Sequence, residues 1–167
     1  IGVGYNQTRK DDPYLTQQFY DLLEPTENDQ FLDIGCGTGN YTHALSEKGV
    51  KLIGVEPSEE MLKKARTKNS TINWVKGTAE EIPLSENIVD GVIAGLTTHH
   101  WQNLKKGFNE VSRVMKPNGR LVIFTSTPKQ MLGYWLNHYF PKMIAQSCTL
   151  MPSLDQTIEA LTEAGLN

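Results

Sequence analysis

Three glycines spaced two residues apart, Gly35, Gly37 and Gly39, follow a short apolar run and come just after an acid, Asp33. Glycine lets the backbone adopt positive φ and approach a ligand closely. A carboxylate at Asp33 disfavours a bound phosphate, but it can accept hydrogen bonds from hydroxyl groups or attract a cation. The stretch therefore predicts a nucleotide-type binding loop for a ligand other than a pyrophosphate.

Glu56 is a second acid placed to bind a nucleoside. It stands at the end of the next apolar stretch, where a carboxylate can accept hydrogen bonds from both ribose hydroxyls. Dinucleotide enzymes place an acid in the same way, and a solvated strand-end acid is the structural alternative, so Glu56 alone does not discriminate. As a strand-end acid, its replacement by Ala is expected to leave the fold nearly intact. Pro57 and Met61 are expected to pack on the adenine or ribose, although Met61 suits a helix core equally well.

An acidic loop led by Gly77 follows the third apolar stretch. Gly77 permits a tight exit from a strand. Backbone amides near Thr78 and Ala79, with the carboxylate of Glu80, could hydrogen-bond the edge of an adenine. By itself the loop is generic, but downstream of the glycine loop it predicts contact with the same ligand.

Two adjacent histidines, His99 and His100, follow the fourth apolar stretch. A histidine there could act as a general base, hydrogen-bond a substrate, or cap the helix expected to begin at Trp101. Adjacent side chains are not expected to point the same way, and no carboxylate lies at chelating spacing beside them. The sequence therefore predicts no metal site.

Apolar stretches and helical patterns alternate along the chain. Strands are expected over 30–34, 51–55, 72–76, 88–94 and 120–125, and helices over 15–23, 40–48, 58–68, 101–115 and 154–164. This alternation predicts an α/β fold with a Rossmann-like, doubly wound, mostly parallel sheet and helices on both faces. Residues 116–119 are expected to form a turn.

Composition excludes several classes of protein. The chain has 167 residues, 16 basic and 19 acidic, so there is no electrostatic case for a nucleic-acid partner. No apolar run reaches the length that spans a membrane, and we expect no membrane partner. Two cysteines, Cys36 and Cys148, do not make a disulfide framework, which favours a reducing, cytoplasmic location.

Three motifs together resemble a known family. The first is Asp33-x-Gly35-x-Gly37-x-Gly39; Asn40 stands where the dinucleotide fingerprint G-x-G-x-x-G needs its third glycine. The others are NIVDGVIAGL over 87–96 and EVSRVMKPNG over 110–119. In this order they resemble the class I S-adenosylmethionine (SAM) methyltransferases, in the small-molecule branch (type 11) that includes the ubiquinone and menaquinone C-methyltransferases. The resemblance covers about residues 5–126. Asn118 replaces a usual glycine, which Asn tolerates because it can adopt the left-handed conformation.

The resemblance implies SAM as the cofactor. The glycine loop would hold its amino-acid part, Glu56 its ribose and residues 77–80 its adenine, while a segment around Tyr5 and Arg9 would fold over it unless the terminus is frayed. The implied cofactor-binding residues are Tyr5, Arg9, Asp33, Gly35, Cys36, Gly37, Gly39, Glu56, Pro57, Met61, Gly77, Thr78, Ala79, Glu80, Gly95, Leu96 and Trp101. His99 and His100 are the candidate catalytic residues.

The implied function is methyl transfer from SAM to a small-molecule acceptor by in-line displacement. The alternatives are a SAM-binding module without catalysis and an NAD-dependent oxidoreductase. One domain is expected over 1–167, with an N-terminal lid segment over about 1–25, a core over about 26–126, and an acceptor-pocket or lid segment over about 127–153. An amphipathic helix that completes the core is the alternative for this last segment.

The family sheet is closed by an antiparallel hairpin, which we expect to be missing because it would follow Asn167. No [DN]-P-P-[YFW] motif follows the fourth strand, which argues against methylation of amino groups on DNA bases. The motifs specify neither the acceptor nor the oligomeric state.

Overall fold

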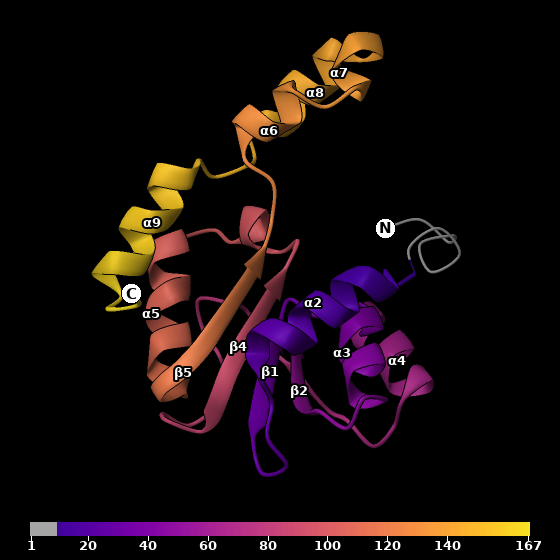
Figure 1. Ribbon diagram of the computed structural model, residues 1–167, viewed down its shortest axis with the longest axis vertical. Helices are drawn as coiled ribbons and strands as arrows, with labels where there is room; N and C mark the ends of the chain where they lie inside the picture. Colours follow the sequence, from indigo (N-terminus) through magenta and orange to yellow (C-terminus); the bar gives the residue numbers. More distant parts are fainter. Residues whose placement is uncertain (1–9) are drawn as a thin grey trace.

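Five strands form one parallel sheet, described for residues 10–167 by a computed structural model (Figure 1). The strands are β1 (Gln30–Ile34), β2 (Lys51–Glu56), β3 (Asn73–Lys76), β4 (Val89–Gly95) and β5 (Met115–Phe124). Their order across the sheet is β3-β2-β1-β4-β5, and every neighbouring pair runs parallel. The order reverses between β1 and β4, and ligands of such sheets bind outside the carboxyl ends of the strands at this switch point.

Helices connect the strands and cover both faces of the sheet. They are α2 (Pro13–Leu23), α3 (Asn40–Ser46), α4 (Glu59–Lys68), the short 3-10 helix η1 (Thr98–His100), α5 (Leu104–Val114), α6 (Pro128–Leu132), α7 (Leu136–Tyr139), α8 (Pro141–Cys148) and α9 (Leu154–Glu163). Among the described residues, none of these helices is long and apolar enough to span a membrane.

Successive residues of β1 point to opposite faces of the sheet, and each face has its own core. Leu32 and Ile34 pack in one cluster with Val111 of α5. Phe31 packs in the other with residues of α2 and α3, including Phe19. The predicted doubly wound α/β fold is confirmed.

The start of α5 differs from the predicted helix over 101–115. The side chain of Asn103 accepts a hydrogen bond from the backbone N–H of Lys106, so the helix begins at Leu104. An asparagine at this position accepts a hydrogen bond from a backbone N–H that would otherwise lack a partner in the helix. Its own backbone is extended, so the helix does not continue before it. Residues 98–100 form their own short helix instead.

The expected turn over 116–119 lies inside β5 as an irregularity. Val89 pairs with Met115, but Gly91 pairs with Arg120, so the residues between them are accommodated as a bulge. Asn118 has a φ of 65°, which confirms the left-handed conformation expected of it.

Helices α6 to α8 project from the carboxyl edge of the sheet, away from the rest of the molecule (Figure 1). Residues 128–148, which contain these three helices, are called the arm below. In the arm, α6 and α7 both pack on α8. Tyr134, Trp135 and Tyr139 are exposed, so the alternative in which this segment completes the core is wrong.

Candidate functional site

A cavity of about 920 Å³ opens at the carboxyl ends of β1, β2 and β4, at the switch point of the sheet. Its size falls within the range of small-molecule and cofactor sites, about 300–1,000 Å³. The lining residues are Lys10, Ile34, Gly35, Cys36, Gly37, Thr38, Asn40, Tyr41, Glu56, Pro57, Met61, Thr78, Ala79, Glu80, Gly95, Leu96, Thr97, His99, His100, Trp101 and Gln102.

The glycine loop turns sharply from β1 into α3 beside this cavity. Gly35, Gly37 and Gly39 all have positive φ, at 71°, 58° and 71°. The backbone N–H groups of Gly35 and Cys36 both donate to the carbonyl oxygen of Val55, so the turn is tied to β2. The loop is therefore held in place before any ligand binds.

Two of the glycines are needed for packing as well as for backbone conformation. A Cβ at Gly35 would lie 1.9 Å from Oγ1 of Thr97, a buried residue after β4. A Cβ at Gly39 would lie 2.3 Å from the indole of Trp74 on β3. Gly39 does not line the cavity, so its part is to let α3 approach the sheet.

Glu56 is buried at the end of β2 and braces the glycine loop. Its Oε2 accepts a hydrogen bond from the backbone N–H of Gly37, and its Oε1 accepts one from the backbone N–H of Ser58, both at 3.0 Å. With only 7% of its surface exposed, it is not the solvated strand-end acid of the alternative interpretation. Two backbone donors depend on this carboxylate, so its loss is now expected to lower the stability of the fold.

Asp33 lies beneath the loop and does not line the cavity. Its Oδ2 accepts a hydrogen bond of 2.6 Å from the hydroxyl of Thr42 on α3. Burial raises the pKa of this carboxyl to about 6; the Thr42 hydroxyl opposes the shift and the charge of Glu56 adds to it. Two neighbouring buried carboxylates thus give this end of the sheet a negative field, which a bound cation would relieve.

Asp33→Asn should raise the free energy of unfolding by up to about 3 kcal/mol at neutral pH and leave it unchanged near pH 4. The folded-state pKa of about 6 lies above the unfolded value of 3.8, so the folded state holds the proton more tightly and wild-type stability falls as pH rises from about 4 to about 6. Asparagine carries no charge and keeps an oxygen for Thr42. Urea unfolding of both proteins between pH 4 and pH 8 measures the difference.

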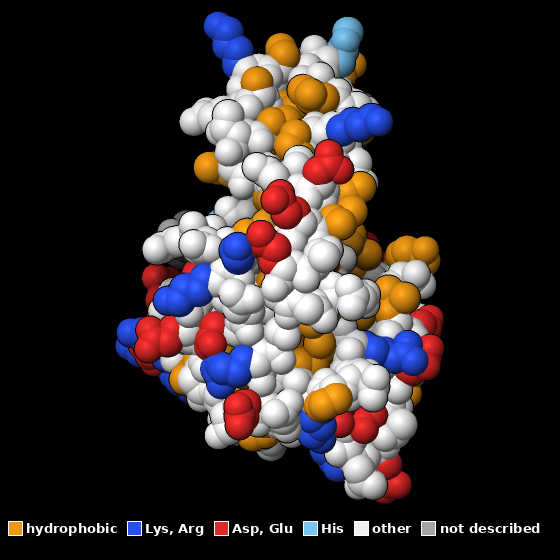
Figure 2. Space-filling view, turned by 90° about the vertical axis from the view of Figure 1, so that its left-hand side faces the viewer, with side chains coloured by type: hydrophobic (Ala, Val, Ile, Leu, Met, Phe, Trp, Pro, Cys, Tyr) orange, Lys and Arg blue, Asp and Glu red, His pale blue; other side chains and the backbone are white. Residues whose placement is uncertain are grey.

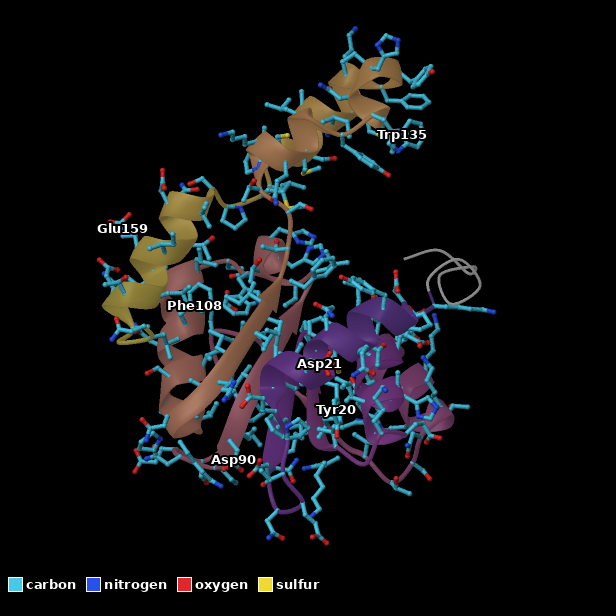
Figure 3. All side chains as sticks on the ribbon, in the orientation of Figure 1. Tyr20, Asp21, Asp90, Phe108, Trp135 and Glu159 are labelled. Carbon is cyan, nitrogen blue, oxygen red and sulfur yellow. The ribbon has the colours of Figure 1, made fainter. Side chains whose placement is uncertain are left out.

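Asp21→Asn, on the exposed side of α2 (Figure 3), is the matched control for removing a carboxylate. If the difference in free energy of unfolding between wild type and Asp33→Asn stays the same from pH 4 to pH 8, the buried charge of Asp33 does not destabilise the fold.

Burial also keeps Cys36 in its thiol form. Its pKa is raised well above the ordinary value, first by burial and then by the charges of Asp33 and Glu56. Cys36 lines the cavity as a small apolar side chain, and a thiolate nucleophile is disfavoured there.

The loop after β3 supplies the next wall. Thr78, Ala79 and Glu80 line the cavity, whereas Gly77 packs closely on Pro83 and does not line it. Oε1 of Glu80 accepts hydrogen bonds from the backbone N–H groups of Gln102 and Asn103, at 2.6 and 3.1 Å. One oxygen of Glu80 thus joins this loop to the segment before α5.

Two residues of the third sequence motif, over 110–119, bind the loop that follows β3. Glu110 and Arg113 on α5 form an ion pair of 2.7 Å. Arg113 donates to the carbonyl oxygens of Ile82 and Leu84, and Glu110 accepts from the backbone N–H of Ile82. The conformation of residues 82–84 therefore depends on the acid and the arginine of that motif.

The end of β4 brings both histidines to the cavity. Their rings lie 3.9 Å apart between centroids, tilted by 44°. The expectation that adjacent side chains point apart is therefore wrong, because η1 and the turn before it direct both rings to one side. Leu96, also on this wall, has a positive φ of 52°, an unusual conformation for leucine. Within residues 10–167, no three His, Cys, Asp or Glu side chains are grouped as they would be to hold a metal ion.

Trp101 separates this cavity from a smaller one. Its ring contacts Phe108 edge to face at 5.0 Å between centroids, and Gly107 leaves room for it. The smaller cavity, of about 420 Å³, lies between η1, α5 and α9, and shares His99, Trp101 and Gln102 with the larger one. Residues 149–152 line it, and no residue of the predicted 127–153 segment lines the larger cavity.

Tyr5 and Arg9 lie outside the described residues. Sequence reasoning missed seven residues that line the cavity: Lys10, Ile34, Thr38, Asn40, Tyr41, Thr97 and Gln102. Asn40 and Tyr41 open the helix after the glycine loop, a position that the loop itself could have indicated. No local pattern marks Thr97, which lies against Gly35 after β1, or Gln102, whose backbone N–H donates to Glu80.

Comparison with known proteins gives a consistent set of matches. The model of the methyltransferase domain family matches residues 32–123. An uncharacterised methyltransferase of Mycobacterium tuberculosis is 37% identical over 122 residues, which cover 73% of this chain and 50% of that protein. A demethylmenaquinone methyltransferase of Oceanobacillus iheyensis is 32% identical over 117 residues, 65% of this chain and 49% of that protein.

A solved structure matches along nearly the whole chain. It is a proposed methyltransferase from an antibiotic biosynthesis pathway of Anabaena variabilis, 34% identical, with a TM-score of 0.85 over 95% of this chain and 63% of that one. The chain spans about half the length of the curated relatives named above.

Proposed function

The chain belongs to the methyltransferase domain family, and from this premise we propose that its larger cavity binds SAM and that it transfers the SAM methyl group to a small-molecule acceptor. The observation that carries the proposal is the meeting of the glycine loop, Glu56 and the loop over 78–80 around one cavity at the switch point. SAM supplies an electrophilic methyl group on a positively charged sulfur.

The charge of the site favours SAM over a dinucleotide. Asp33 and Glu56 are both buried at the glycine loop, so the field there is negative. The ammonium and sulfonium groups of SAM are attracted by this field, whereas the pyrophosphate of NAD is repelled. Glu56 uses each oxygen for one backbone amide, and a carboxylate oxygen can accept a second hydrogen bond, here from a ribose hydroxyl.

The remaining walls suit the rest of the cofactor. Pro57 and Met61 border the cavity beside Glu56 and would contact the adenosine. Thr78, Ala79 and Glu80 would bind the adenine edge, while Gly95, Leu96 and Trp101 would border the methyl group. Gly39 and Gly77 act through packing, and Tyr5 and Arg9 stay predicted contacts.

The chain's contribution to the chemistry is alignment, exclusion of water and removal of a proton where the acceptor carries one. His99 and His100 line the cavity by the end of β4. We propose that one of their imidazoles accepts the proton that the acceptor loses. The acceptor would enter on their side, where the smaller cavity shares His99. The segment over about 1–25 would serve the single domain as a lid, and the segment over about 127–153 would form an acceptor wall through residues 149–152, which line the smaller cavity.

Binding of S-adenosylhomocysteine without binding of NAD is the expected first result. At a hundredfold excess over its dissociation constant, the ligand should stabilise the fold by about 2.7 kcal/mol, seen as a rise in melting temperature. Transfer of tritium from labelled SAM to a metabolite extract then tests catalysis. A shift with NAD alone would contradict the proposed cofactor, and tight SAM binding with no labelled product would favour the non-catalytic module.

A further inference from the structure

The arm carries an exposed apolar surface that the proposed function does not use. Its helices pack on one another through Ile144, which is buried, while larger side chains face outwards. Those with between 49% and 66% of their surface exposed are Leu132, Tyr134, Trp135, Tyr139, Phe140 and Met143. Exposed apolar clusters of this size commonly mark contact surfaces.

The aromatic side chains of the arm form a connected row. The rings of Tyr134 and Trp135 lie 5.6 Å apart between centroids, those of Trp135 and Tyr139 6.1 Å, and those of His138 and Tyr139 5.0 Å. Figure 3 places Trp135 on the arm, far from the sheet. Tyrosine and tryptophan combine an apolar ring with a polar group, which suits the boundary between lipid and water.

The charge of the arm has one sign. The chain contains no Asp or Glu from residue 111 to residue 154, although it has 19 acidic residues in all. Lys129 and Lys142 are the charged residues of the arm, and both are exposed. In Figure 2 the arm shows hydrophobic, Lys and His side chains, and the acidic side chains begin below it.

We propose that the arm docks on the surface of a lipid bilayer that contains anionic lipids, with the aromatic row at the level of the headgroups. Apolar area and lysines together give the two attractions that interfacial binding needs. A second copy of the arm would bring like charges together and offer no acid to pair with them. Docking of this kind needs no spanning helix, so it is compatible with the helix lengths described above. It departs from the expectation of no membrane partner, which rested on the absence of an apolar run long enough to span a membrane.

The geometry places the lipid on the side of the cavity. The arm and the larger cavity both lie at the carboxyl edge of the sheet (Figure 1). An arm resting on a bilayer would therefore bring the cavity close to the lipid phase. The proposal concerns the arm alone and holds whether or not the cavity binds SAM.

Tryptophan fluorescence of the full chain tests the docking directly. The three tryptophans are Trp74, which is buried, Trp101, which is packed on Phe108, and Trp135, which is 62% exposed. Vesicles of phosphatidylcholine with phosphatidylglycerol should shift the emission to shorter wavelength, and vesicles of phosphatidylcholine alone should do so much less. In Trp135→Phe the shift should vanish while the protein still sediments with the anionic vesicles.

Two variants separate the contributions, and a third is the control. Lys129→Glu with Lys142→Glu should weaken sedimentation with anionic vesicles by at least about 30-fold, at about 1 kcal/mol for each lysine lost. Trp135→Ser with Tyr139→Ser and Phe140→Ser should weaken it by at least about tenfold. Tyr14→Ser with Leu22→Ser removes exposed apolar side chains from α2 and should change nothing.

Three outcomes would overturn the proposal. The first is no fluorescence shift with anionic vesicles, and the second is an equal loss of vesicle binding in the α2 control. The third is a dimer that depends on Trp135, measured by light scattering, with no vesicle binding; the surface would then be an interface between copies. Circular dichroism and urea unfolding of each variant check that its fold is kept, as expected for exposed positions.

Discussion

Replacing Glu56 by Ala is expected to weaken binding of S-adenosylhomocysteine by at least about tenfold and to lower the free energy of unfolding by about 1–3 kcal/mol. Hydrogen bonds to a charged group contribute about 1.5–3 kcal/mol each, so the loss of one ribose contact weakens binding by about 10- to 150-fold. The fold is affected because the backbone N–H groups of Gly37 and Ser58 both donate to this carboxylate. Calorimetry gives the affinity, and urea unfolding without ligand gives the stability.

Glu56→Gln should lose less of both quantities. One oxygen remains to accept a hydrogen bond, but the amide nitrogen cannot accept one from the other backbone donor. Glu81→Ala removes an exposed acid from the neighbouring loop and is the matched control for charge. Unchanged affinity in both Glu56 variants would mean that the ribose is bound elsewhere, and unchanged stability would mean that water replaces the carboxylate at the two amides.

Replacing the working histidine of the His99 and His100 pair by Gln should slow methyl transfer by about 10²- to 10⁴-fold, the usual contribution of a general base. Binding of SAM should change little. In the wild type the rate should rise with pH, because only a neutral imidazole can accept the proton. The variant should lose this dependence. Single-turnover rates with an identified acceptor measure both effects.

The two histidines are replaced one at a time. Their rings lie 3.9 Å apart between centroids, so either ring can take over the other's contact with the ligand, but only one of them takes the proton. His138→Gln, on the exposed arm, is the control for losing an imidazole far from the cavity. A flat pH profile with both single variants active would mean that alignment alone drives the reaction. The acceptor would then be a nucleophile with no proton to remove.

The order of elements followed from the sequence because it depends on local signals. Apolar stretches of strand length and the capping residue Ser58 are read directly from neighbouring residues. The left-handed conformation of Asn118 was predictable for the same reason, since it concerns one residue's own backbone. The start of α5 was placed too early because Trp101 fits a helical pattern, whereas Asn103 caps the helix and makes it begin at Leu104.

The sequence by itself determined the glycine loop, the acids around it and the family that they resemble, because these are fixed by residue type and spacing. Only the tertiary structure decided which of them face the cavity. Asp33 and Gly39 belong to the motif, yet Asp33 is covered by Thr42 of the following helix, and Gly39 is covered by Trp74 of β3, a strand distant in the chain. Thr97, which no pattern marked, reaches the cavity because Gly35 leaves room for it. Burial and contact depend on neighbours that folding brings together. They therefore cannot be inferred from the spacing of residues within one segment.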